Sequence, residues 1–174
     1  MPDIREKVED DRGLIKKIQL HIPGYAGYRR REDIRAADNI LRLWIVDQVK
    51  GLRGGLEGIR DQMAQDGKYQ GLQVIGNEIF RLQGIEGKIR HAEQGYSGFS
   101  PAIRVEEGEL DKLYEYDYAM IDNIDKCSAL VPAISQAGDM PSFNAAVKAF
   151  HDALLAFDSS WDQRMPAATQ TNVR

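Results

Sequence analysis

Residues 34–63 read IRAADNILRLWIVDQVKGLRGGLEGIRDQM, and this stretch decides the fold of the chain. Its apolar side chains recur at alternating steps of four and three, which places them on one face of an α-helix. The repeat comprises Ile34, Asp38, Leu41, Ile45, Val49, Leu52, Leu56, Ile59 and Met63. We therefore predict a helix from about residue 31 to about residue 67, which at ~1.5 Å per residue would be about 50 Å long.

Four other segments carry the same repeat and predict four more helices. These segments lie at about 4–22, 72–91, 107–136 and 142–161. No segment shows the alternation of apolar and polar residues that is typical of strands. The sequence thus predicts an all-α fold, an elongated up-and-down helical bundle of four long helices plus an N-terminal helix. We expect a single domain over residues 1–164 and a flexible C-terminal tail at 165–174.

Proline, glycine and serine mark the predicted ends of the helices. Pro23 and Gly24 end the first helix, and Gly67 ends the second. Pro132 is expected to kink or end the fourth helix, because proline lacks a backbone N–H. Ser142 is the predicted N-cap of the last helix.

The composition bounds the class of protein. The chain has 174 residues, of which 43% are hydrophobic and 29% are charged, as in one globular domain. No apolar stretch approaches the roughly 20 residues that span a bilayer, and the N-terminus has no apolar signal core, so we expect a cytoplasmic protein. The formal net charge of −4 argues against nucleic acid as a partner.

Histidine and cysteine give no metal-binding or catalytic pattern. Cys127 is the single cysteine and falls on the apolar repeat of the fourth helix, which favours an inert core thiol. His21, His91 and His151 are scattered, and no Glu-x-x-His pair of a di-iron bundle occurs. We therefore predict no catalytic residue, no metal site and no cofactor.

Three aspartates occupy positions at which the repeat calls for an apolar side chain: Asp11, Asp38 and Asp117. A buried carboxylate is costly unless it meets a cation or a hydrogen-bond donor. The expected partners are Arg35, Arg42 and the hydroxyls of Tyr114, Tyr116 and Tyr118. Two interpretations stay open: a polar layer that fixes helix register, or a small-molecule or metal site inside the bundle.

Glycines are frequent in the second predicted helix, although each costs roughly 0.5–1 kcal/mol relative to alanine. Gly51 and Gly55, like Gly54 and Gly58, are four residues apart and would form shallow grooves on the helix. We expect these grooves to pack against a neighbouring helix or a second subunit. The alternative is a flexible helix that bends on binding.

A basic segment precedes the second helix and is the candidate for binding an anion. It comprises Arg29, Arg30 and Arg31, with Lys16 and Lys17 nearby in sequence. Arginines and backbone N–H groups at a helix N-terminus can bind the phosphates of lipid headgroups or of other ligands. The alternative is a solvated basic turn that pairs with acidic side chains.

The segment IPGYAGYRRREDIRAADNILR, residues 22–42, resembles the N-terminal signature of an uncharacterised family of small helical prokaryotic proteins. The signature is Pro-Gly-Tyr-x-Gly-Tyr followed by an arginine- and acid-rich helix start. The resemblance implies a helical fold and carries no activity. It groups Tyr25, Tyr28, Arg31, Arg35 and Asp38 as a unit. With Asp117, four of these residues (Tyr25, Tyr28, Arg35 and Asp38) form the candidate polar core.

These patterns predict a non-enzymatic helical scaffold or adaptor, whose partner is another protein or a second copy of the chain. One alternative is peripheral binding to an anionic membrane surface or to other phosphates through the basic turn at 29–31. A further alternative is small-molecule or metal binding within the bundle at Asp38 and Asp117.

Overall fold

The computed structural model describes residues 4–25, 31–92 and 107–169, and the side-chain environments of 13–25, 37–92 and 112–164. In these ranges every regular element is helical, which confirms the predicted all-α bundle. The elements are α1 (Ile4–His21), α2 (Arg31–Gln65), a short 3₁₀ helix η1 (Tyr69–Gly71), α3 (Leu72–His91), α4 (Glu107–Ser135) and α5 (Met140–Thr169).

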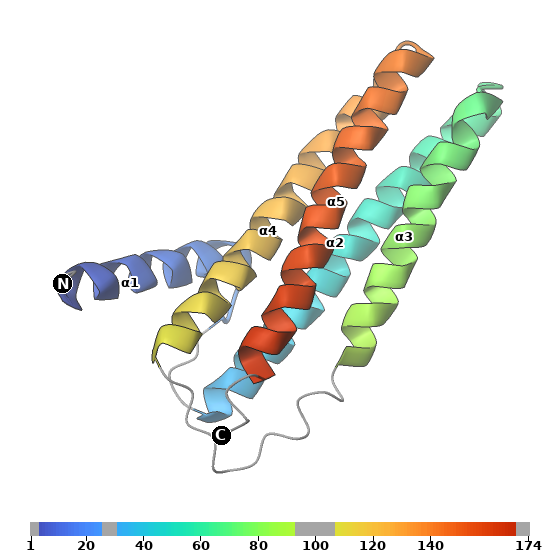
Figure 1. Cartoon of the computed structure of the whole chain (residues 1–174). Helices are drawn as coiled ribbons and strands as arrows, with labels where there is room; N and C mark the ends of the chain where they lie inside the picture. Colours follow the sequence, from blue (N-terminus) through green and yellow to red (C-terminus); the bar gives the residue numbers. More distant parts are fainter. Residues whose placement is uncertain (1–3, 26–30, 93–106, 170–174) are drawn as a thin grey trace.

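The four long helices form two hairpins that lie side by side (Figure 1). One hairpin is α2 and α3, the other is α4 and α5, and contacts between α2 and α4 and between α3 and α5 join them. Helix α1 contacts α4 and crosses the bundle at a steep angle, with the N-terminus pointing away from it. No described helix is both long and apolar enough to cross a bilayer.

The predicted apolar stripes form one core. Almost every described stripe residue is buried, including Leu41, Ile85, Met120 and Phe157, and the side chains pack as one cluster that spans all of the long helices. The period of 3.6 residues therefore identified the inward faces correctly.

Two glycines shape the turns that end α1 and α2. Among the described residues only Gly24 and Gly67 have a positive φ, of 85° and 72°. At the end of α2 the N–H groups of Gly67 and Lys68 donate to the carbonyls of Ala64 and Met63. This pattern satisfies carbonyls that the helix leaves open, and a glycine adopts the required conformation without strain.

Two predicted boundaries differ from the structure. Asp139, and not Ser142, caps α5, because its carboxylate Oδ1 accepts a hydrogen bond of 2.8 Å from the Ser142 N–H. Helix α5 continues to Thr169, into the segment for which the sequence predicts a tail. Helix α4 ends at Ser135, close to the predicted end at about residue 136, and Pro132 lies inside it without ending it.

The glycines of α2 face two different environments. A Cβ on Gly55 would lie 3.3 Å from Cγ1 of Val131 on α4, so this glycine permits the close approach of two helices. A Cβ on Gly51, Gly54 or Gly58 would meet no atom within 4 Å. The predicted packing against a neighbouring helix is therefore confirmed at Gly55. The other three glycines meet no helix of the same chain, and their packing against a second subunit stays a prediction.

Candidate functional site

The two aspartates of the candidate polar core meet in a buried charged layer, which consists of Asp38, Arg42, Asp117 and Arg164. Asp38 and Arg42 come from α2, Asp117 from α4 and Arg164 from α5. The exposed fraction is 2% for Asp38, 0% for Asp117 and 1% for Arg164. The layer thus joins three helices at a depth from which water is excluded.

Arg164 bridges the two carboxylates. Its Nη1 lies 2.7 Å from Oδ1 of Asp38, and its Nε donates to Oδ1 of Asp117 at 2.5 Å. Arg42, one turn after Asp38, donates to Oδ2 of Asp38. Two carboxylates and two guanidinium groups leave the layer without net charge, which is the condition under which such groups are tolerated in a core.

Tyr25 connects the turn after α1 to the charged layer. Its side chain is buried, and its hydroxyl donates to Oδ2 of Asp117 at 3.1 Å. The Gln19 side-chain amide donates to the Tyr25 carbonyl at 2.9 Å and holds the backbone at this turn. Tyr25 is therefore placed as the sequence predicted, on the same polar layer as Asp38 and Asp117.

The geometry favours a structural role for the charged layer over a ligand site. Both aspartates already accept charge-assisted hydrogen bonds from arginine, and among the described residues no three His, Cys, Asp or Glu side chains gather as metal ligands would. The arrangement can fix the register of α2, α4 and α5, since a shift of any one helix would separate charges that are now paired.

Sequence reasoning identified one of the two arginines. Arg42 pairs with Asp38 as predicted, whereas Arg164 was missed because the predicted stripe of the last helix stopped at Trp161. Arg164 continues that four-and-three repeat by one further step, and this is the signal that could have found it. The side chains of Asp11, Tyr28 and Arg35 lie outside the described residues.

The candidate anion-binding residues are only partly described. Lys16 and Lys17 are exposed on α1, and the Lys17 ammonium lies 5.1 Å from the centre of the Tyr118 ring on α4. Leu20, on the same helix, is 84% exposed. The side chains of Arg29, Arg30 and Arg31 lie outside the described residues, and the anion site formed by the five cations stays a prediction.

His21 and His151 bridge helices. Nε2 of His21 lies 3.0 Å from Asp125, which links α1 to α4, and Nδ1 of His151 lies 3.0 Å from Glu78, which links α5 to α3. Each histidine thus has a carboxylate partner on another helix, and both make structural contacts.

Cys127 is buried, as its place on the apolar repeat predicted. Its side chain is fully buried on α4, and burial raises its pKa to about 12, well above the ordinary value for a thiol. Because the thiolate is the nucleophile, a thiol with this pKa is protonated and unreactive at neutral pH.

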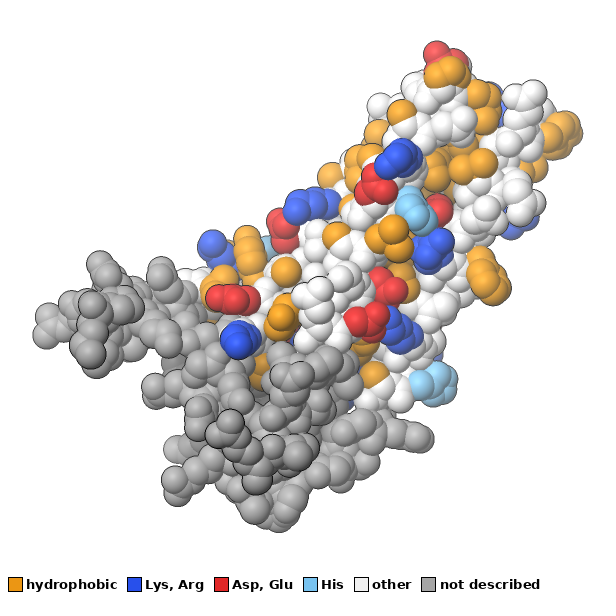
Figure 2. Space-filling model, in the orientation of Figure 1, with side chains coloured by type: hydrophobic (Ala, Val, Ile, Leu, Met, Phe, Trp, Pro, Cys, Tyr) orange, Lys and Arg blue, Asp and Glu red, His pale blue; other side chains and the backbone are white. Residues whose placement is uncertain are grey.

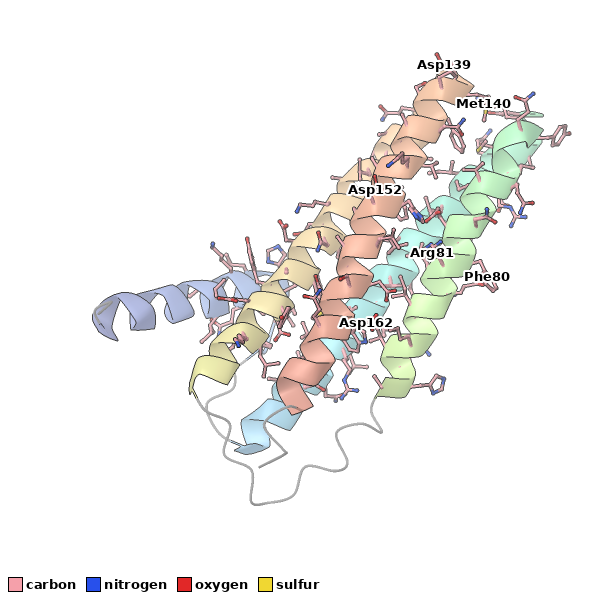
Figure 3. The ribbon with its side chains drawn as sticks, in the orientation of Figure 1. Phe80, Arg81, Asp139, Met140, Asp152 and Asp162 are labelled. Atoms are coloured by element: carbon pink, nitrogen blue, oxygen red, sulfur yellow. The ribbon has the colours of Figure 1, made fainter. Side chains whose placement is uncertain are left out.

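One surface of α3, which we call the α3 face, is uncharged and carries an exposed aromatic ring. It comprises Gln73, Gly76, Asn77, Phe80, Gln83, Gly84 and Gly87, which share one side of the helix. Phe80 is 76% exposed and points away from the bundle (Figure 3). Its neighbours one turn away along the helix are Gly76 and Gly84 at four residues and Asn77 and Gln83 at three residues, so no large or charged side chain of α3 lies beside the ring. Sequence reasoning did not single out this face.

Comparison of the sequence with protein-family models and with curated proteins, and of the fold with solved structures, finds no match.

Proposed function

We propose that this chain is a non-enzymatic helical scaffold whose α3 face binds another protein or a second copy of the chain. The observation that carries the proposal is the exposure of Phe80 on a helix surface without charged side chains. A single exposed apolar side chain is common on proteins, but here the flanking positions are glycine, glutamine and asparagine.

The α3 face has the shape that close helix packing uses. A Cβ on Gly84 would meet no atom within 4 Å, and the same holds for Gly87. A partner helix could therefore approach the α3 backbone closely, with Phe80 as the largest contact. Burying a phenylalanine contributes about 1.5–3 kcal/mol. The seven residues of the face are uncharged, and a charge, the Arg60 guanidinium, lies at one edge of the face, where its Cζ would lie 3.9 Å from a Cβ on Gly76.

Sedimentation velocity and affinity capture test this proposal. We expect the purified protein either to self-associate or to capture a stoichiometric partner from native extract, and Phe80→Arg to abolish that association. Leu155→Arg is the matched control, because Leu155 is also an exposed apolar residue but lies on α5. A monomer without a partner, or association that Phe80→Arg leaves unchanged, would exclude the α3 face as the contact surface.

A second candidate function is peripheral binding to an anionic membrane. It is favoured by the exposure of Lys16, Lys17 and Leu20 on α1, since basic residues beside an apolar one are typical of helices at a membrane surface. Co-sedimentation with phosphatidylserine vesicles should be lost at high salt and when Lys16 and Lys17 are both replaced by glutamine. Binding that neither change affects would contradict this function.

A further inference from the structure

The tips of the two hairpins enclose a pocket of about 430 Å³, which we call the tip pocket. It lies between the turn from α2 to α3 and the turn from α4 to α5. Figure 2 shows hydrophobic side chains exposed between these tips. The volume falls within the roughly 300–1,000 Å³ of small-molecule sites, and it is about three times that of a cavity that holds benzene.

The walls of the tip pocket are apolar and come from both hairpins. Ile59 and Met63 on α2 oppose Ile134 on α4 and Met140 and Phe143 on α5. Met140 is the first residue of α5 and lies beside Asp139 (Figure 3). Two methionines in the lining are suited to ligands of varied shape, because the thioether side chain is flexible and polarisable.

Gly71 lets two lining residues of the tip pocket, Met63 and Phe143, pack against η1. A Cβ at position 71 would lie 2.3 Å from Cε of Met63 and 2.9 Å from Cε1 of Phe143, so a side chain there would displace them. Both residues are at least nine-tenths buried, and this part of the pocket wall is therefore well packed.

The mouth of the tip pocket has an excess of negative charge. Asp66 lies on one hairpin turn and Asp139 on the other, and both line the pocket. Lys68 is the cation among the lining residues, and its Nζ lies 3.6 Å from Oδ2 of Asp66, which leaves one net negative charge. Tyr69, 69% exposed, adds an aromatic ring whose face attracts cations.

Four helix ends meet at the tip, and their partial charges offset one another. Helices α2 and α4 end there with partial negative charge on their carbonyl groups, and α3 and α5 begin there with partial positive charge on their N–H groups. The excess of negative charge at the tip pocket therefore comes from the side chains. Hydrogen bonds from the Ser142 hydroxyl and N–H to Asp139 lower the pKa of this carboxyl, so it is ionised at neutral pH.

We propose that the tip pocket binds an amphiphilic cation, a small molecule with an apolar aromatic or aliphatic body and one amine. The body fills the apolar volume between the hairpins, and the ammonium group lies at the mouth near Asp66, Asp139 and Tyr69. A second copy of the chain fits less well, because two such tips would bring four carboxylates together. The pocket and the α3 face are separate surfaces, so this proposal does not depend on the scaffold function.

The test uses two probes that share one apolar body and differ in charge. They are 2-naphthylmethylammonium and 2-naphthylacetate, each titrated into the full chain and followed by amide chemical shifts. We expect the cation to bind about fivefold more tightly than the anion, as one exposed ion pair allows, and to shift the amides of residues 66–71 and 137–143. Equal or tighter binding of the anion, or shifts elsewhere, would overturn the proposal.

Variants separate the apolar and the charged contributions. Ala137→Phe and Gln62→Trp each place a large ring at the pocket. We expect each to weaken the binding of the cation by at least about tenfold. Replacing Asp66 and Asp139 together by asparagine should remove the preference for the cation while keeping the α5 cap, since asparagine caps as well as aspartate.

The matched control replaces Asp122 and Asp152 by asparagine. These exposed aspartates lie on the middle turns of α4 and α5, and each pairs with a lysine four residues away. The control has the same change in net charge and should retain the preference. If it loses the preference too, or if both bulky variants fold and bind the cation normally, the site is not the tip pocket.

Discussion

Arg164 is the residue on which the charged layer depends most. It contacts Asp38 and Asp117 at once, and it is 1% exposed. Replacing it by methionine would leave the two buried carboxylates of the layer with one guanidinium group. We expect Arg164→Met to lower the free energy of unfolding by about 3–5 kcal/mol, as removal of one member of a buried ion pair does. Urea denaturation followed by circular dichroism measures this loss.

Arg81→Met is the control for that measurement. Arg81 is exposed on α3, and its Nε lies 3.8 Å from Glu78, so its loss should cost less than about 1 kcal/mol. Equal effects of the two substitutions would show that Arg164 does not act through the buried carboxylates.

The burial of Cys127 predicts a slow reaction of its thiol and a loss of stability at alkaline pH. Burial raises its pKa to about 12, so a thiol reagent at pH 8 should modify the folded protein far more slowly than the urea-unfolded protein. The raised pKa means that the unfolded chain loses this proton first as the pH rises. The protonated Cys127 thiol therefore makes its full contribution to the free energy of unfolding below about pH 8.5. This contribution is lost as the pH rises from about 8.5 to about 12. Cys127→Ala should lack this part of the alkaline loss, and rapid labelling of the folded protein would contradict the burial.

At the residue scale, the sequence predicted that Asp38 and Asp117 need partners but could not identify all of them. Arg42 is one helical turn from Asp38, so local spacing finds it. Arg164 and Tyr25 reach Asp117 across the fold, at sequence separations of 47 and 92. Periodicity shows which side of a helix is buried, but it does not show which buried positions of different helices lie at the same level.

At the scale of one helix, the glycines of α2 give opposite expectations. Gly51→Ala should stabilise the protein by about 0.5–1 kcal/mol, because alanine is the better helix former and its Cβ meets nothing. Gly55→Ala should stabilise the protein less than Gly51→Ala does, or destabilise it, because its Cβ would lie 3.3 Å from Val131. Thermal unfolding of both variants provides the comparison. If Gly51→Ala destabilises instead, that face of α2 is packed against something in solution.

The start of α5 gives a second expectation at this scale. Asp139→Ala should cost about 1 kcal/mol, because the Ser142 N–H would lose its acceptor, whereas Asp139→Asn should cost little. The free energy of unfolding of both variants tests the cap. Similar losses for alanine and asparagine would mean that the charge, and not the cap, stabilises this end.

The helices themselves were well predicted, because each stripe is long and regular, but their ends were not. Ser142 resembles an N-cap in sequence, yet Asp139 is the cap, since Met140 and Pro141 already belong to the helix. Proline is tolerated there because the first turn of a helix has no internal acceptor for its backbone N–H.

At the scale of the whole molecule, the two hairpins are held differently along their length. In the middle, Glu78 contacts His151, and in the last turn of α3 Lys88 contacts Asp158 at 2.8 Å and Asp162. Partial burial alone would lower the pKa of Lys88, but hydrogen bonds to these two aspartates raise it. At the tip, by contrast, the two hairpins leave the tip pocket between them.

We therefore expect the hairpins to separate more readily at the tip than in the middle. Spin labels at Gln70 and Gln136, on the two tip turns, should give a broader distance distribution than labels at Arg81 and Asp152 (Figure 3). The spin labels are attached to cysteines introduced at these positions. Cys127 is buried, so it should not take up the label. Equally narrow distributions would mean that the tip is as rigid as the middle. The sequence predicted a bundle but not the order in which the helices pack, because each apolar stripe could face several neighbours.

The charged layer also has a consequence for synthesis of the chain on the ribosome. Asp38 is made early, and Arg164, its partner on α5, is added 126 residues later, which takes roughly 6–25 s at about 5–20 residues per second. Until then the layer has two aspartates and one arginine, Arg42, which contacts Asp38, so burying both carboxylates is costly. We therefore expect a chain that terminates before Arg164 to stay open at the charged layer and to be more accessible to proteases than the chain that includes this residue.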